Sequence, residues 1–265
     1  MNISQIQAKL LNKYDILKNV HVVGYCYDYQ QLKKRLGKTA STVFDDLILK
    51  YKYPRVGIGG GSTIYEFVKS SKELNRRIKI FPTALIGRGP EITYYDSSFL
   101  AMLMHLKSRP ESNVFIVNIP PFPNRTSGAK KFKNYLLSNI DEVNWIYKLM
   151  NTIDIAFISV GAMAYTGDFD KEMNKLGVTI KDLSINGVVG GINYNWFTAE
   201  GLQKTDYFLT VSIDKLKELS KKHKKRIVLV AGGSHKINAI KIALESEMIN
   251  TLITDYQSAK YLLNS

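Results

Sequence analysis

Residues 228–238 read VLVAGGSHKIN and decide the fold of this chain. The apolar run is typical of a buried strand, the glycine pair of a tight turn, and the residues that follow of a helix start. Such a corner presents backbone N–H groups at the positive end of a helix, where a phosphate or carboxylate binds. A second corner, VGIGGGST, occupies residues 56–63. Two such corners in one chain predict a small anionic ligand.

Strand and helix patterns alternate along almost the whole chain, which predicts an α/β fold with a doubly wound, mostly parallel sheet. Ligands of such sheets bind at the carboxyl ends of the strands, where both corners would lie. The expected strands are 20–25, 56–59, 79–85, 113–119, 153–160, 226–231 and 249–253. The expected helices are 2–19, 30–50, 62–69, 97–106, 126–150 in two pieces, 236–245 and 255–262.

An antiparallel hairpin is expected to interrupt this alternation, with strands 189–197 and 207–211 joined by a turn at 199–201. The chain has no obvious linker or repeat. We therefore expect one compact body, in which residues 53–265 form the ligand-binding domain and residues 1–52 are a helical segment packed on it.

The composition narrows the class of protein. The 265 residues carry a formal net charge of +14, but the lysines are spread along the chain, so charge alone does not predict a nucleic-acid-binding face. The single cysteine, Cys26, excludes an intramolecular disulfide, and no His or Cys spacing suggests a metal site. No apolar run is long enough for a membrane span, and residues 1–20 do not read as a signal peptide. We expect a cytoplasmic protein with no membrane partner.

The candidate ligand-binding residues follow the ends of predicted strands. They are Gly59, Gly60, Gly61, Ser62 and Thr63 in the first corner, Gly232, Gly233, Ser234 and Lys236 in the second, and Gly87, Arg88, Gly161 and Asp168 in other loops. The first corner has neither the lysine spacing of a P-loop nor the pattern of a dinucleotide fingerprint. We therefore expect no cofactor.

Several of these residues have a second interpretation. Arg88 lies between glycines after strand 79–85, so it suits a bidentate phosphate contact or is an exposed loop cation. Asp168 either accepts a hydrogen bond from a sugar hydroxyl or, as we favour, caps the helix after it. His235 is interpreted as an exposed residue at a helix start, whereas Lys236 would pair with an oxyanion.

Catalytic patterns are scarce. The sequence has no Ser-His-Asp order with a nucleophile elbow, no His-Glu metal motif and no acid pair of glycosidase type. This favours a site that holds a ligand over one that transforms it.

The motif blocks resemble the effector-binding domain of SorC-type and DeoR-like bacterial transcriptional regulators. The similar blocks include residues 56–65, NVFIVNIPPF at 113–122, DIAFISVGA at 154–162, residues 187–201, LTVSIDKL at 209–216, and above all residues 227–239 with 249–263. The resemblance implies a Rossmann-like fold related to ribose-5-phosphate isomerase and the sugar-phosphate deaminases. It also implies phosphate contacts from residues 59–63 and 232–236, and an effector contact from the loop of Arg88.

The resemblance further implies that a phosphorylated sugar is the effector. Its binding would alter the assembly of a homo-dimer or tetramer, and thereby the affinity of the regulator for DNA. The family's DNA-reading helix-turn-helix precedes the effector domain, and residues 1–20 match the segment after that module, so DNA would be bound only through a module absent from this chain. Gly191 stands where family members commonly carry aspartate. A stand-alone sugar-phosphate isomerase-like enzyme is the alternative, with Asp168 its candidate acid or base. A basic nucleic-acid-binding protein ranks last.

Overall fold

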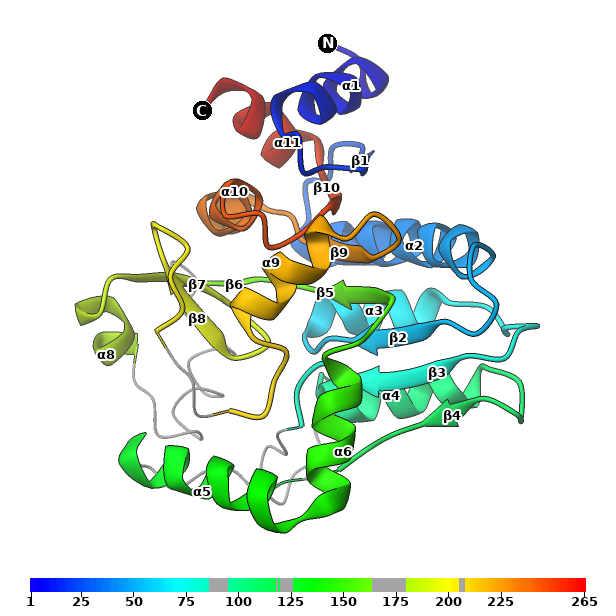
Figure 1. Ribbon diagram of the computed structural model, residues 1–265. Coiled ribbons are helices and arrows are strands. Elements are labelled where there is room, and N and C mark those ends of the chain that lie inside the picture. Colours follow the sequence, from blue (N-terminus) through cyan, green and yellow to red (C-terminus); the bar gives the residue numbers. More distant parts are fainter. Residues whose placement is uncertain (86–94, 118, 120–125, 164–179, 205–207) are drawn as a thin grey trace.

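The computed structural model describes residues 1–85, 95–117, 119, 126–163, 180–204 and 208–265. Its core is a seven-stranded sheet in the order β1-β10-β9-β5-β2-β3-β4, and every pairing between neighbours is parallel (Figure 1). The strands are β1 (Asn19–Val23), β2 (Arg55–Ile58), β3 (Lys79–Pro82), β4 (Asn113–Val114), β5 (Ile155–Ile158), β9 (Arg226–Val230) and β10 (Thr251–Asp255). The predicted α/β fold with a mostly parallel sheet is confirmed.

The strand order places a change of direction at the centre of the sheet. From β2 the chain builds β3 and β4 outward on one side, and it then returns to the other side of β2 to form β5, β9 and β10. The order β4-β3-β2-β5-β9-β10 is the 3-2-1-4-5-6 order of doubly wound nucleotide-binding folds. In such sheets the ligand crevice lies outside the carboxyl ends of the two strands at the reversal, here β2 and β5.

Helices cover both faces of the sheet, and alternate strand residues supply the two cores. One core contains α2 (Tyr29–Ile48), α3 (Ser62–Ser70) and α4 (Ser97–Leu106). The other contains α1 (Ile3–Lys13), α6 (Asp141–Met150), α9 (Ile213–Lys221), α10 (Ile237–Glu245) and α11 (Tyr256–Asn264). In β9, Val228 and Val230 join the first core, whereas Ile227 and Leu229 join the second.

The two ends of the chain lie side by side at the β1 edge (Figure 1). α1 packs against α11, and the Lys13 ammonium donates hydrogen bonds to the carbonyl oxygens of Leu262 at 2.9 Å and Ser265 at 2.7 Å. β1 pairs with β10 in register from Asn19 with Thr251 onward. The segment 1–52 thus contributes a strand to the main sheet, and its separation at residue 52 stays a prediction.

The antiparallel element contains a turn that divides the predicted strand 189–197. β6 (Gly161–Ala162), β7 (Val188–Ile192) and β8 (Asn195–Thr198) form a small second sheet. The hairpin turns at Asn193 and Tyr194, whose φ angles of 52° and 62° suit a two-residue turn. The expected turn at 199–201 is also present, where the Gly201 N–H donates to the Thr198 carbonyl oxygen at 3.0 Å and Phe197 forms an antiparallel bridge with Gln203. The expected strand at 207–211 is wrong for residues 208–211, which form no regular strand; residue 207 lies outside the described residues. Leu209 instead accepts a hydrogen bond from the Leu85 N–H at 2.9 Å, beyond the end of β3.

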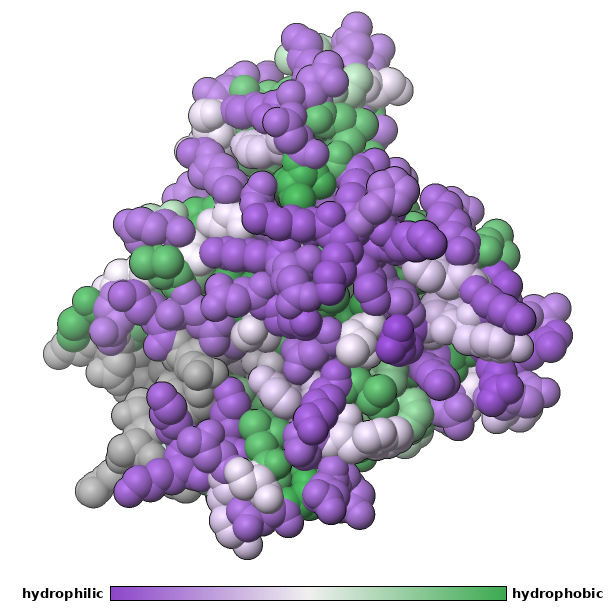
Figure 2. All heavy atoms as spheres, viewed as in Figure 1, coloured by the Kyte–Doolittle hydropathy of each residue, from purple (hydrophilic) through white to green (hydrophobic). Residues whose placement is uncertain are grey.

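The remaining helices extend the two layers. α5 (Thr126–Asn139) precedes α6, as the prediction of two pieces required, and α8 (Ile180–Ile185) leads into β7. The predicted helix at 236–245 begins with a 3-10 turn, η1 (Ser234–Lys236), and continues as α10. Hydrophilic side chains cover most of the face that Figure 2 shows. None of the helices in the described ranges combines the length and apolar character needed to cross a bilayer.

α2 and α3 cross at a glycine. A Cβ atom on Gly37 of α2 would lie 2.5 Å from the Glu66 carbonyl carbon and 2.6 Å from the Phe67 nitrogen, both in the backbone of α3. No side chain fits there without moving one helix. This contact fixes the distance between α2 and the helix that begins at the first glycine corner.

We expect Gly37→Ala to lower the free energy of unfolding by about 1–3 kcal/mol, because the added methyl group forces the helices apart. The same change in an open helix position would instead stabilise it by about 0.5–1 kcal/mol. Urea unfolding followed by circular dichroism measures the difference. Thr42→Ala, at an exposed position of α2, is the control. Equal stability of the two variants would contradict the close approach.

Candidate functional site

Both glycine corners lie at the carboxyl edge of the sheet. The first follows β2 and leads into α3, and the second follows β9 and leads into η1 and α10. β5 is the only strand between β2 and β9 in the sheet order, so the strands that carry the corners are separated by two strand spacings, roughly 10 Å. The corners therefore flank the crevice at the β2–β5 reversal from two sides.

The first corner requires glycine at residue 60, and it leaves backbone N–H groups that can donate hydrogen bonds to a ligand. A Cβ on Gly60 would lie 2.8 Å from the Tyr95 carbonyl oxygen, and the Gly61 N–H donates to that same oxygen at 2.8 Å. Gly61 is the N-cap of α3 with a φ of 104°, and it has no side chain to cap the helix. The N–H groups of the first turn, from Ser62 and Thr63, remain directed out of the helix end.

The two hydroxyls of this corner differ in role. Thr63 is only 3% exposed and belongs to the interior. Ser62 is partly exposed, and its Oγ lies 3.4 Å from the ammonium nitrogen of Lys33 in α2. Sequence reasoning missed Lys33. The available signal was its helical register with Leu36 and Gly37, which places a lysine, 8% exposed, on the buried face of α2.

A buried carboxylate shapes the second corner. Asp255, at the end of β10, accepts hydrogen bonds from the Gly233 N–H at 2.7 Å and the Ser258 hydroxyl at 2.6 Å. It also accepts from the N–H groups of Gln257 and Ser258, both at 3.0 Å, and so caps α11. A Cβ on Gly232 would lie 2.5 Å from an Asp255 oxygen. The sequence indicated the glycine turn but not this carboxylate.

Lys236 carries the positive charge of the second corner. Burial, and then the charge of Lys33, lower the pKa of the Lys236 ammonium to about 8. No hydrogen-bond acceptor or carboxylate pairs with this ammonium among the described residues. Two lysines from different elements thus lie close enough for the charge of one to disfavour the charge of the other, and a bound anion would offset this repulsion.

His235 lies at the border of the site. Its ring packs edge-on against Tyr29 with centroids 4.8 Å apart, and the Lys33 ammonium sits 5.2 Å from the centre of the same Tyr29 ring. Burial and the charge of Lys236 lower the pKa of His235, against a smaller opposing effect of Asp255. The surroundings of the imidazole therefore disfavour its charged form.

Buried polar groups without a partner in the described part of the chain lie near the first corner and the end of β5. The Thr83 hydroxyl donates to Asn193 Oδ1 at 2.7 Å, and the buried Asn193 Nδ2 has no partner in the described part of the chain. The Ser159 hydroxyl, just beyond β5, is also buried without a hydrogen-bond partner among the described residues. A Cβ on Gly59 would lie 3.5 Å from Asn193 Oδ1, so this asparagine adjoins the first corner. Asn193 is not among the ligand-binding residues predicted from the sequence.

The other predicted positions are distributed as follows. Gly161 begins β6, directly after Ser159 and Val160. Ser234 is exposed on the far side of the second corner, whereas Gly87, Arg88 and Asp168 lie outside the described residues. Within the described ranges no three His, Cys, Asp or Glu side chains gather as metal ligands would.

Side-chain packing explains why residue 191 is a glycine. Any Cβ at this position of β7 would overlap the ring of Trp196, which is 2% exposed and lies across the hairpin. An aspartate here would have to displace that ring. The hairpin therefore presents no carboxylate at this position, and its nearest polar group to the crevice is Asn193.

Comparison with known proteins agrees with this architecture. The family model described as "Putative sugar-binding domain" matches residues 1–264. A DeoR family transcriptional regulator from Listeria monocytogenes superposes with a TM-score of 0.81 at 21% identity, over 98% of this chain and 99% of that one. The full-length sorbitol operon regulator SorC from Klebsiella pneumoniae gives 0.83 at 18% identity, over 99% and 82%. A search of curated proteins finds no significant match.

At these identities the solved structures establish the shared fold, and the family model supplies the membership. The resemblance to SorC and DeoR effector domains is confirmed on both grounds. With a doubly wound sheet, two glycine corners at its carboxyl edge and a family match from end to end, this chain belongs to the sugar-binding domain family.

Proposed function

We propose that this chain is the ligand-sensing domain of a transcriptional regulator and that its ligand is a phosphorylated sugar. The observation that carries the proposal is the pair of lysines, Lys33 and Lys236, that converge between two glycine corners. The regulator assignment rests on the family and on the solved regulators that share the fold.

A phosphate group fits this arrangement better than a neutral sugar does. Two partly buried ammonium groups of like charge repel each other, and a dianionic phosphate between them removes that repulsion. Its oxygens also accept from the free N–H groups at the start of α3, where the helix dipole adds to the attraction. A neutral ligand would not reduce the repulsion between the two ammonium groups.

The sugar portion would occupy the middle of the crevice. Asn193 Nδ2 and the Ser159 hydroxyl are shielded polar groups that a bound hydroxyl would satisfy. Because Trp196 occupies the space beside Gly191, the sugar meets an amide there instead of a carboxylate.

The bound ligand would act through the position of helices. Lys33 lies on α2, Ser62 on α3 and Lys236 at the start of α10, so one phosphate contacts three elements. In the proposed regulator, a phosphate that holds these three elements together changes the arrangement of a homo-dimer or tetramer. That change alters how tightly a separate module binds DNA.

We expect a sugar phosphate to raise the melting temperature, with a stabilisation of about 4 kcal/mol when its concentration is a thousand times Kd. Lys236→Met and Lys33→Met should each weaken binding by about 1.5–3 kcal/mol, since each removes a charge-assisted hydrogen bond. Thermal shift with pentose and hexose phosphates, followed by calorimetry, measures both effects.

Lys34→Met is the matched control, because Lys34 is the exposed neighbour of Lys33 on the same helix and its loss changes the net charge equally. It should bind as the unaltered chain does. The proposal fails if no sugar phosphate binds, or if both buried-lysine variants bind as tightly as Lys34→Met. Recovery of the sugar phosphate unchanged by NMR distinguishes a sensor from the isomerase-like alternative.

Affinity for the phosphate should fall as pH rises through 8. The free protein holds the pKa of Lys236 at about 8, so the ammonium is charged at pH 7 and loses its proton above pH 8. Because a phosphate monoester has its second pKa near about 6, the ligand stays dianionic from pH 7 to 9. Only the charged lysine attracts it, so Kd should rise about tenfold over this range.

Lys236→Arg provides the control for this pH dependence. An arginine stays charged throughout the range, so any phosphate binding that it retains should be nearly independent of pH between 7 and 9. A flat profile in the unaltered chain, or an equally steep one in Lys236→Arg, would contradict the role of this ammonium.

A further inference from the structure

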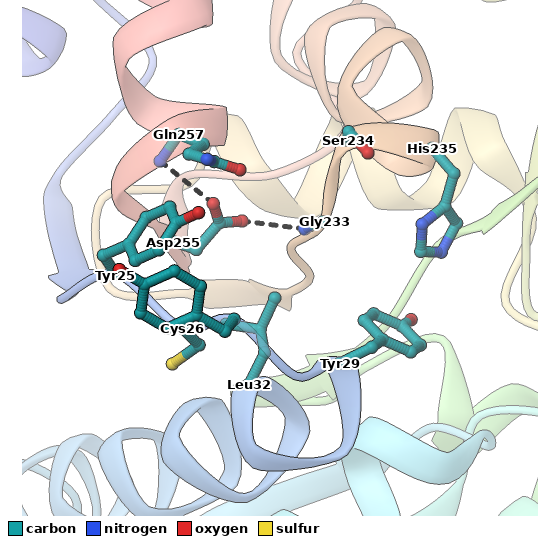
Figure 3. A pocket seen from close by; sticks show the side chains of 10 residues that line it. Tyr25, Cys26, Tyr29, Leu32, Gly233, Ser234, His235, Asp255 and Gln257 are labelled. Carbon is teal, nitrogen blue, oxygen red and sulfur yellow. Dashed lines mark hydrogen bonds between the residues drawn. The ribbon is translucent and has the colours of Figure 1, made fainter.

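A cavity lies beside the second glycine corner, between the β1–α2 loop and the start of α11 (Figure 3). It has a volume of about 300 Å³. The loop after β1, the start of α2, the Gly233–His235 turn and the start of α11 enclose it. Its lining residues are Tyr25, Cys26, Tyr27, Tyr29, Leu32, Gly233, Ser234, His235, Asp255 and Gln257. We call this cavity the tyrosine pocket.

A packed wall separates the tyrosine pocket from the lysine pair. A Cβ on Gly233 would lie 3.0 Å from the His235 ring and 3.1 Å from the Tyr29 ring, and the two rings also contact each other. Tyr29 has the pocket on one side and the Lys33 ammonium near its ring. A phosphate at Lys33 and Lys236 would therefore lie beyond this wall, so the pocket is a separate compartment.

The lining of the pocket offers ring faces and neutral polar groups. Tyr25 and Tyr27 pack edge to face with centroids 4.7 Å apart, and Tyr27 stands at the rim, 94% exposed. The hydroxyl of Ser234 and the side-chain amide of Gln257 have no protein partner within the described ranges. Both can donate and accept hydrogen bonds.

The pocket holds no charge that is free to pair with a ligand. The Asp255 carboxylate is the one acidic group in the lining, and four hydrogen bonds from Gly233, Gln257 and Ser258 already occupy its oxygens. Among the described residues no lysine or arginine lines the cavity, and burial lowers the pKa of His235, which disfavours its charged form. These surroundings disfavour both a phosphate and an ammonium group.

We propose that the tyrosine pocket is a second binding site and that it takes an uncharged ring-shaped polyol, an unphosphorylated monosaccharide. The exposed Tyr27 ring covers the C–H face of the sugar, while Ser234 and Gln257 bind its hydroxyl groups. Tyrosine suits this task because it supplies a flat apolar face beside a polar group at low entropic cost. The cavity volume is at the small end of ligand sites and matches a single sugar ring.

The second site stands independently of the proposed phosphate site. Half of its lining, Tyr25, Cys26, Tyr27, Asp255 and Gln257, comes from the β1–α2 loop, the end of β10 and the start of α11, none of which supplies the lysine pair. The two sites share only the Gly233–His235 turn and Tyr29. Variants of Lys33 and Lys236 can therefore silence one site while the other is measured.

The test is saturation-transfer NMR with unphosphorylated pyranoses, among them glucose, galactose, mannose and xylose, on the full chain carrying Lys33→Met and Lys236→Met. At least one pyranose should bind at millimolar concentration. Tyr27→Ala and Gln257→Ala, each added to this background, should weaken it about tenfold or more. Tyr261→Ala, another exposed tyrosine but outside the lining, should leave the affinity unchanged.

The reactivity of the Cys26 thiol reports whether a sugar is bound in the tyrosine pocket. It is the only cysteine and lines the pocket, so a bound pyranose should slow its reaction with a thiol reagent, and inorganic phosphate should not. The proposal is overturned if no pyranose binds, if Tyr27→Ala and Gln257→Ala both leave binding intact, or if only a flat heterocycle such as adenine protects Cys26. Loss of phosphate binding in the lysine variants with pyranose binding retained separates this result from that of the phosphate site.

Discussion

The repulsion between Lys33 and Lys236 is the constraint around which this edge of the molecule is organised. Buried ammonium groups are costly to hold near each other, and the fold holds them by packing the stems of both residues into helix starts and the inner face of α2. Burial first, and the nearby Lys33 charge second, lower the pKa of Lys236. In the proposed function, a bound anion would offset both effects.

The glycines make this arrangement possible. Gly37 lets α2 approach α3 closely enough to bring Lys33 to Ser62, and Gly60 lets the first corner pass the Tyr95 carbonyl. Gly232 leaves room for the Asp255 carboxylate, which fixes the second corner. Each position lacks a side chain because another part of the chain occupies its space. The shape of the crevice is therefore set by close backbone contacts.

The sequence predicted the parts of the fold that depend on local pattern. The stretch 228–238 identified a buried strand, a turn and a helix start, because parallel strands are apolar throughout and paired glycines interrupt them visibly. The sequence could not predict Lys33 as a site residue. Helical register shows that a residue is buried, but it does not show which helix covers the glycine corner. The turn at Asn193-Tyr194 was missed because it lacks the glycine that usually signals a hairpin turn. The predicted turn at 199–201 has such a glycine, Gly201.

Asp255 was described as the residue that fixes the second corner, and it also joins that corner to a distant part of the molecule. One carboxylate oxygen holds the Gly233 N–H and the other holds the first turn of α11. The far end of α11 is fastened to α1 through Lys13. These short hydrogen bonds connect rigid helices, so a displacement of the Gly233 turn is shared by α11 and α1. The second glycine corner, α11 and α1 thus form one hydrogen-bonded series that ends at the start of the chain.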